Sequence, residues 1–294
     1  MKKLLVFLSV LLVLFLAACG GDSDNDTTEN DTADDAETTE DEAAEETEPA
    51  EITVGASSTP HAEILEEARP LLEEENITLN IEEYQDYVFP NDDLASGELD
   101  ANYFQHIPFL EQTISDTGYE LDYIDGIHVE PMGVYSQGIA SVDDIPDGTE
   151  VIISNSVADH GRILALFESE GLITLPEGVD PEELSLDDIE DNPLNLTFSP
   201  DVDPAFLPEQ YFAEEDALVA INTNYAIDAD LNPLEDALFI EGEDSPYVNI
   251  IGVRAEDMEN EALNKLVEVL QSEEIQNFIL ENYDGAVVPV GGNN

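Results

Sequence analysis

One arginine occupies a position from which it could bind an anion. Residues 154–167 read SNSVADHGRILALF, and the apolar pattern predicts a helix that begins near Gly161 and Arg162. Backbone N–H groups at a helix N-terminus attract anions, and a guanidinium beside them can grip a carboxylate through two hydrogen bonds. The helix dipole disfavours a cation in the first turn, so an arginine there indicates a functional role for Arg162. A surface ion pair, worth about 0 to 1 kcal/mol, is the alternative that these residues alone leave open.

Cations are scarce in this chain, which makes Arg162 more informative. The 294 residues include 6 Lys and Arg against 71 Asp and Glu, and the formal net charge is −65. Beyond the first three residues the basic side chains are Arg69, Arg162, Arg254 and Lys265. At about 1 M salt the Debye length falls to roughly 3 Å and such a charge is screened, so we predict a halophilic source, or an alkaliphilic one living in brine. The sequence offers no basic patch to attract nucleic acid.

Two further regions concentrate aromatic and amide side chains near the ends of expected strands. The first combines YQDYVFPN at residues 84–91 with LDANYFQH at residues 99–106, and the second combines AINTNYA at residues 220–226 with SPYVN at residues 245–249. Open α/β sheets bind ligands beyond their strand ends, and an asparagine there offers the donor and the acceptor that suit a zwitterion. Core packing of the aromatic rings and turn formation by the asparagines are the alternatives.

The N-terminus predicts secretion followed by lipidation. Lys2 and Lys3 precede a mostly apolar run that is shorter than the roughly 20 residues of a membrane-spanning helix but typical of a secretory signal, so we expect residues 1–18 to be removed. Cys19 is the only cysteine, which excludes an intrachain disulfide. The stretch LAACG resembles the lipobox of bacterial lipoproteins, which implies that an acyl group such as palmitate on Cys19 anchors the protein at the extracytoplasmic face of the cell membrane.

The segment after the signal has the composition of a spacer. From Gly20 to about Glu51 the chain contains Asp, Glu, Thr, Asn and Ala, no aromatic residue and no Lys or Arg. Such a segment cannot bury enough surface to offset the entropy of ordering it, so we predict that residues 19–51 form a disordered acidic tether. A partner-binding acidic tail is the alternative.

From Ile52 onward the sequence alternates between strand and helix patterns. Residues 52–294 are long enough for one large α/β unit or for two lobes, and we find no internal sequence repeat. Interleaved strands and helices predict a mainly parallel sheet covered by helices, and we expect Pro70 to kink or interrupt the first helix. The expected strands are 52–56, 77–81, 120–124, 132–136, 150–154, 194–198, 217–221 and 250–254, and the expected helices follow Thr59, begin at Pro90, follow Pro108, and span about 160–170, 209–213, 223–229 and 259–282.

Taken together, these segments resemble the methionine-binding lipoproteins of the NlpA family, the substrate receptors of methionine ABC importers. The resemblance covers nearly all of residues 52–290 and lies in PHAEI, DYVFPN, GELDANYFQHIPFL, the GR helix, INTNYA, SPYVN and GAVVP. It implies a two-lobe periplasmic-binding-protein fold, type II-like, with a ligand cleft between the lobes. Lobe 1 would be 52–136, lobe 2 would be 137–247, and 248–294 would return to lobe 1, with strands 132–136 and 250–254 as the paired crossover strands.

The resemblance also implies which residues hold the ligand. Arg162 would pair with the α-carboxylate of the amino acid, while Asn222 and Asn249 would hold its carboxylate and amino ends. Aromatic edges favour a polarizable sulfur by about 0.3 to 1.5 kcal/mol. The side chains expected around the thioether are Tyr87, Phe104 and His106, with Tyr103 as a weaker candidate.

One loop departs from the family's pattern. Members of the family often have N-D-P-T-N-x-G-R, where this chain has NSVADHGR at residues 155–162, and the change brings Asp159 towards the expected cleft. The resemblance implies L-methionine as the ligand, but the changed loop leaves D-methionine, a methionine-containing dipeptide or another small amino acid as alternatives. The protein would work as a monomer without a cofactor and pass the ligand to an ABC permease and its ATPase.

Two other functions are weaker. A metal-ion receptor could use His61, His106, His128 and His160, but the sequence contains no pair with metal-ligand spacing. An enzyme could use His106 with Asp100 for acid–base chemistry. However, the sequence has no nucleophile-elbow motif, no P-loop and no cysteine in its folded region, so we predict neither catalytic residues nor a metal site.

Overall fold

The computed structural model describes residues 49–242 and 245–291. The expected signal peptide at 1–18, Cys19 and the expected tether up to residue 48 lie outside these described residues. Among the residues that are described, no helix combines the length and the apolar character needed to cross a membrane. The first strand begins at Ala50, because Ala50 and Glu51 pair with Ile77 and Thr78, so the C-terminal end of the expected tether is part of a sheet.

The first sheet has six strands in the order β11-β4-β10-β3-β1-β2. β1 runs parallel to β2 and β3, whereas β10 runs antiparallel to β3 and β4, and β11 runs antiparallel to β4. The strands are β1 (Ala50–Ser57), β2 (Ile77–Tyr84), β3 (Ala101–Tyr103), β4 (Leu121–Val129), β10 (Val248–Arg254) and β11 (Val288–Pro289).

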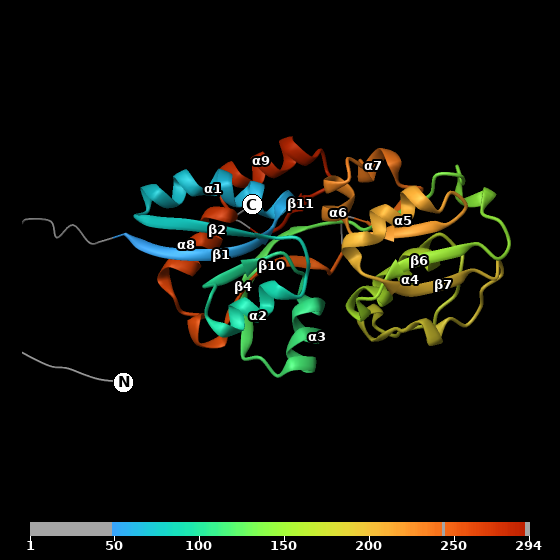
Figure 1. Ribbon diagram of the computed structural model, residues 1–294, viewed down its shortest axis with the longest axis horizontal. Coiled ribbons are helices and arrows are strands. Elements are labelled where there is room, and N and C mark those ends of the chain that lie inside the picture. The colour runs from blue at the N-terminus through green and yellow to red at the C-terminus, as the bar shows by residue number, and fades with distance from the viewer. Residues whose placement is uncertain (1–48, 243–244, 292–294) are drawn as a thin grey trace, which may run out of the picture. The chain divides into compact units, whose positions relative to one another are not determined.

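Helices cover both faces of the first sheet (Figure 1). Along β10 the buried side chains alternate, since Ile251 and Val253 join one hydrophobic cluster and Ile250 joins the other. The first cluster contains α1 (Glu63–Glu74), α8 (Glu261–Leu270) and α9 (Glu273–Tyr283), and the second contains α2 (Phe89–Ser96) and α3 (Ile107–Thr117).

The first helix agrees with its apolar pattern but not with the expected break. Four apolar side chains of α1 are buried at helical spacing, as an amphipathic helix requires. Pro70 lies inside α1, which continues to Glu74, so of the two expected effects, a kink or an interruption, the interruption is wrong. Pro70 is exposed, and on that side of the helix water can satisfy the carbonyl that the proline leaves unpaired.

The second sheet has five strands in the order β7-β6-β8-β5-β9. Both of its faces are buried, since Val151 and Ile153 of β6 pack into one cluster and Ile152 into another, which explains the unbroken apolar run. The strands are β5 (Gly133–Tyr135), β6 (Glu150–Ser154), β7 (Thr197–Val202), β8 (Leu218–Ile221) and β9 (Phe239–Ile240), and the helices are α4 (Val157–Ser169), α5 (Leu207–Ala213), α6 (Thr223–Asp228) and α7 (Pro233–Asp236).

Each sheet contains both parallel and antiparallel strand pairs, so the expectation of a mainly parallel sheet is only partly correct. In each sheet one strand beside a crossing segment is inserted antiparallel: β10 lies between β3 and β4, and β5 lies between β8 and β9. As a result the order β2-β1-β3-β10-β4 recurs as β7-β6-β8-β5-β9. The topology therefore repeats although the sequence does not.

The chain passes between the sheets twice, at residues 130–132 and again between the end of β9 and the start of β10. β5 belongs to the second sheet, so the boundary expected after residue 136 falls too late in the chain. The expected pairing of strands 132–136 and 250–254 is wrong as well, because β5 pairs with β8 and β9 while β10 pairs with β3 and β4.

The long helix expected at 259–282 is two helices. α8 ends at Leu270, and Ser272 caps α9 by accepting a hydrogen bond from the backbone N–H of Ile275. A serine at that position satisfies an amide of the first turn that has no partner inside the helix. The cap lets the chain change direction, and both helices pack on the same face of the first sheet.

Candidate functional site

Arg162 lies in the second turn of α4, because the helix begins at Val157 rather than near Gly161. The first turn holds Asp159, an acid, which the helix dipole favours. The expectation of a cation in an unfavourable first-turn position is therefore wrong. Of the residues that depart from the family's loop pattern, Asp159 lines the pocket described below, whereas Val157 is exposed.

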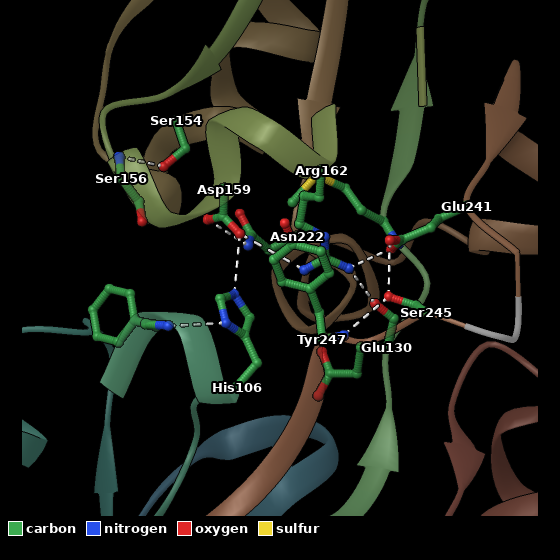
Figure 2. Close-up of polar contacts among 12 residues, drawn as sticks. His106, Glu130, Ser154, Ser156, Asp159, Arg162, Asn222, Glu241, Ser245 and Tyr247 are labelled. Atoms are coloured by element: carbon green, nitrogen blue, oxygen red, sulfur yellow. Dashed lines mark hydrogen bonds and ion pairs between the residues drawn. The ribbon is translucent and has the colours of Figure 1, made fainter. Parts of the chain in front are cut away.

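The Arg162 side chain is buried and already paired. Its Nη2 donates to the Glu241 carboxylate at 2.5 Å and to the backbone carbonyl of Glu130 at 3.0 Å. The guanidinium carbon lies 4.5 Å from the centre of the Tyr247 ring, and Nη1 is 3.6 Å from the Asp159 carboxylate (Figure 2). Burial alone would lower the pKa of Arg162, but Glu241 and Asp159 raise it above its ordinary value, so the guanidinium stays charged.

The glycine before Arg162 allows a close contact. A Cβ atom at Gly161 would lie 1.6 Å from the carbonyl oxygen of Pro181. Pro181 begins the short 3-10 turn Pro181–Glu183, which packs against α4. Only glycine leaves room for the Pro181–Glu183 turn to approach α4 this closely.

A pocket with about 400 Å³ of empty space, counting space open to solvent, surrounds these groups. Segments attached to both sheets contribute to it, so the pocket forms where the two sheets meet. Its lining residues are Tyr87, Phe104, Gln105, His106, Phe109, Glu130, Asp159, Arg162, Asn222, Thr223, Asn224 and Asn249.

Three aromatic rings form one wall of the pocket. The centre of the Tyr87 ring is 5.9 Å from that of Phe104 and 5.8 Å from that of Phe109. The Tyr87 hydroxyl also donates to Asn224 Oδ1 at 2.6 Å, which connects the first-sheet side to α6. Tyr87 and Phe104 were expected from the sequence, whereas Phe109 was missed, although it follows Pro108 inside the motif that carried the resemblance.

His106 connects the aromatic wall to Asp159. Its Nδ1 accepts the backbone N–H of Phe109 at 3.2 Å, so Nε2 carries the proton and donates to the Asp159 carboxylate at 3.1 Å (Figure 2). Asn222 donates to the other oxygen of Asp159 at 3.3 Å. Burial would raise the pKa of Asp159, but His106, Arg162 and Asn222 lower it to about 2, so the carboxylate is ionised.

Tyr103 does not line the pocket within the described chain, which removes it from the candidates. It is buried in the core of the first sheet, where its hydroxyl contacts His128 Nδ1 and its ring lies 4.7 Å from that of His61. The alternation of side chains along a strand explains this, since Tyr103 and its neighbour Phe104 point in different directions. Asn249 does line the pocket, and its Oδ1 accepts from His61 Nε2 at 3.0 Å.

Glu130 is a pocket carboxylate that the sequence did not reveal. One of its oxygens lies 2.8 Å from His128 Nε2 and 3.2 Å from His61 Nε2, and the other accepts the backbone N–H of Asn224 at 3.1 Å. Burial would raise the pKa of Glu130, but these neighbours lower it, so the carboxylate is ionised. A single acid among 71 Asp and Glu carries no signal of its own.

The fold brings His61, His128 and Glu130 together, with ligand atoms within 4.8 Å of one another, although they are distant in sequence. His128 Nε2 lies 2.8 Å from a Glu130 oxygen and therefore carries a proton, which leaves Nδ1 to accept from the Tyr103 hydroxyl. His61 Nε2 faces two oxygens and therefore also carries a proton. Because His128 Nε2 donates to Glu130 and His61 Nε2 donates to Asn249, these contacts describe a hydrogen-bonded cluster.

Comparison with known proteins identifies the family. The sequence profile of the NlpA lipoprotein family matches residues 52–291. The chain belongs to this family. The methionine-binding lipoprotein MetQ of Bacillus subtilis is 43% identical over 295 residues, which is 99% of each chain. The D-methionine-binding lipoprotein MetQ of Escherichia coli is 34% identical over 241 residues, 82% of this chain and 88% of that one.

Solved structures of relatives confirm the two-lobe α/β fold. A putative methionine-binding lipoprotein from Bacillus subtilis is similar with a TM-score of 0.80 at 46% identity, covering 82% of this chain and 98% of that one. A nutrient binding protein from Burkholderia cenocepacia bound to methionine gives 0.77 at 35% identity, covering 82% and 100%. These relatives are named as binding proteins, in agreement with the family that the sequence indicates.

Proposed function

We propose that this protein binds methionine in the pocket between its two sheets and delivers it to an ABC importer. The observation that carries the proposal is that three buried polar atoms of pocket residues have no partner in the described chain: Arg162 Nε, Asn222 Oδ1 and Asn224 Nδ2. Buried polar atoms are normally paired, so these two donors and one acceptor point to a ligand. Donors suit a carboxylate and an acceptor suits an ammonium group, which together describe an amino acid.

Arg162 would bind the carboxylate of the ligand. Glu241 and the Glu130 carbonyl already hold Nη2, and this fixes the guanidinium before the ligand arrives. The carboxylate would therefore take Nε, with Asn224 Nδ2 as a second donor. His61 already binds Asn249 Oδ1, whereas Asn222 Oδ1 has no partner in the described chain, so we assign Asn249 to the carboxylate end through its Nδ2 and Asn222 to the amino end.

The aromatic wall of Tyr87, Phe104 and Phe109 would receive the thioether. Sulfur is polarizable and gains from contact with ring edges, which distinguishes methionine from shorter aliphatic amino acids. His106 completes this side of the pocket through its bond to Asp159. The relatives include proteins named for methionine and for D-methionine, so L-methionine is our first choice and D-methionine, a methionine-containing dipeptide or another small amino acid are the alternatives.

The names of the relatives also support a place outside the cytoplasm. They are lipoproteins, and one similar structure, at 33% identity and a TM-score of 0.76, is an ABC transporter periplasmic substrate-binding protein from Coxiella burnetii that covers 81% of this chain and 100% of that one. We accordingly propose that Cys19 is lipidated after removal of residues 1–18 and that residues 19–51 serve mainly as the tether. The protein would act as a monomer, without catalysis, beside a permease and its ATPase.

Calorimetry tests the proposal. Wild-type protein in about 2 M salt, where surface charges are screened, should bind L-methionine. Arg162→Ala should weaken that binding by about 100-fold or more, because the carboxylate would be desolvated without its cation. The control is Arg69→Ala, which removes a partly exposed arginine paired with Glu66 and should change nothing. Unchanged affinity in Arg162→Ala would exclude Arg162 from the site, and absence of binding by the wild type would refute the function.

A further inference from the structure

The charges around the pocket do not balance. Glu130, Asp159 and Arg162 line the pocket, and the Glu241 carboxylate accepts a hydrogen bond from Arg162. Three carboxylates thus share one guanidinium. In a buried site an uncompensated charge is costly, so the imbalance indicates that a positive group belongs there.

The uncompensated carboxylate is Glu130. Arg162 lies 2.5 Å from Glu241 and 3.6 Å from Asp159, so its charge serves those two acids. Across residues 49–242 and 245–291, the Glu130 carboxylate has ion-pair contacts with His61 and His128 and with no Lys or Arg. Burial lowers the pKa of His61 to about 4, so this imidazole does not neutralise Glu130 at pH 7. His128 orients the carboxylate by donating its Nε2–H to it.

Glu130 also has acceptor capacity left on the side that lines the pocket. A carboxylate offers about four lone-pair positions. One oxygen receives the Nε2–H of His128 and lies 3.2 Å from His61 Nε2, while the other receives only the backbone N–H of Asn224. Asn222 Oδ1, an acceptor with no partner in the described part of the chain, belongs to the same pocket. An ammonium group with three N–H donors fits two acceptors of this kind.

The carboxylate is held in place before any ligand binds. Tyr103 orients His128 from the core, so His128 presents its Nε2–H to Glu130, and the hydrogen bond to Asn249 holds His61 Nε2 at 3.2 Å from the same carboxylate. All four supporting side chains are buried. A preorganised acceptor loses little entropy on binding, which makes its interaction with a cation more favourable.

We propose that Glu130 is the acceptor for the α-ammonium group of the ligand and makes the pocket selective for amino acids with a free, charged amino group. The inference rests on the proposed function, because it takes the ligand to be an amino acid. Methionine analogues whose amino group is acylated or replaced by a hydroxyl leave Glu130 buried without a cation. Asp159 is not assigned this role, because its carboxylate, unlike that of Glu130, has a guanidinium beside it in Arg162.

The test compares two probes of nearly equal size, L-methionine and 2-hydroxy-4-(methylsulfanyl)butanoate, by calorimetry at pH 7 on the purified full chain. The wild type should prefer L-methionine by about 100-fold, and Glu130→Gln, of nearly the same shape, should reduce that preference by about 10-fold or more. The matched variant Asp159→Asn should weaken both probes by similar factors and leave their ratio unchanged.

The outcomes separate the two proposals. If the wild type binds both probes equally, the role of Glu130 is overturned. This result needs no variant, so it decides the matter even if the Glu130→Gln protein does not fold. A preference that survives Glu130→Gln, or that disappears in Asp159→Asn, overturns it as well. A wild type that binds no L-methionine refutes the proposed function itself, and the role of Glu130 falls with it.

Discussion

The Asp159 carboxylate should make the stability of the folded protein depend on acid pH, and the structure sets the size of the effect. Burial would raise its pKa, but the contacts with His106, Arg162 and Asn222 lower it from 3.8 to about 2. Since one pKa unit corresponds to about 1.4 kcal/mol, the lowered pKa is worth about 2 kcal/mol of folding free energy at neutral pH. Asp159→Asn should therefore lower the free energy of unfolding by about 2 kcal/mol at pH 7.

The direction of the pH dependence follows from the lowered pKa. As the pH falls, the unfolded chain protonates Asp159 near its ordinary pKa of 3.8, whereas the folded protein holds the carboxylate ionised down to about 2. The stabilisation is therefore fully present above the unfolded pKa and is lost as the pH falls through the folded one. About 1 kcal/mol of it should be gone at pH 3.

Urea unfolding followed by circular dichroism, at constant high salt and several pH values between about 7 and 2.5, measures this effect. The difference between wild type and Asp159→Asn should shrink steadily towards acid pH. Asp116→Asn changes an exposed acid on α3 and serves as the control, with little effect at any pH. A wild-type advantage that stays constant from neutral to acid pH would refute the electrostatic account and leave only packing.

Two further substitutions test the packing around the site. Gly161→Ala should lower the free energy of unfolding by about 1 to 3 kcal/mol, because its Cβ would lie 1.6 Å from the Pro181 carbonyl oxygen. The control in the same urea titration is Gly242→Ala, whose Cβ would meet no atom within 4 Å. Phe109→Ala should weaken L-methionine binding by about 10-fold through loss of an aromatic contact, with the exposed Phe212→Ala as the control in calorimetry. Equal effects of variant and control would contradict either prediction.

The sequence predicted the elements whose patterns are dominated by burial. The strand at 150–154 was predicted with its observed bounds, because three consecutive apolar residues buried on both faces leave little ambiguity. The start of α4 was missed, because Asp159 and His160 interrupt the apolar pattern of the helix, and both are buried polar residues. The mixed pairing of the sheets was missed as well, since the pattern of one strand does not reveal which strands lie beside it.

For the site, the resemblance supplied what residue patterns could not. Six of the expected residues line the pocket: Tyr87, Phe104, His106, Arg162, Asn222 and Asn249. Tyr103 does not. Glu130 could not have been found from composition, because its role depends on two histidines that only the folded chain brings to it. The halophilic source and the lipid on Cys19 stay predictions.

Glu130 lies on the first segment that crosses between the sheets, directly after β4. Its backbone carbonyl binds Arg162 of α4, while its side chain is held by histidines that belong to the core of the first sheet. The same residue is thus part of a connector between the lobes and part of the pocket. A substitution of Glu130 therefore acts on the lining of the pocket and on the contact between the first crossing segment and α4 at the same time. Its effect on ligand binding cannot be separated from its effect on the packing between the lobes by changing this residue alone.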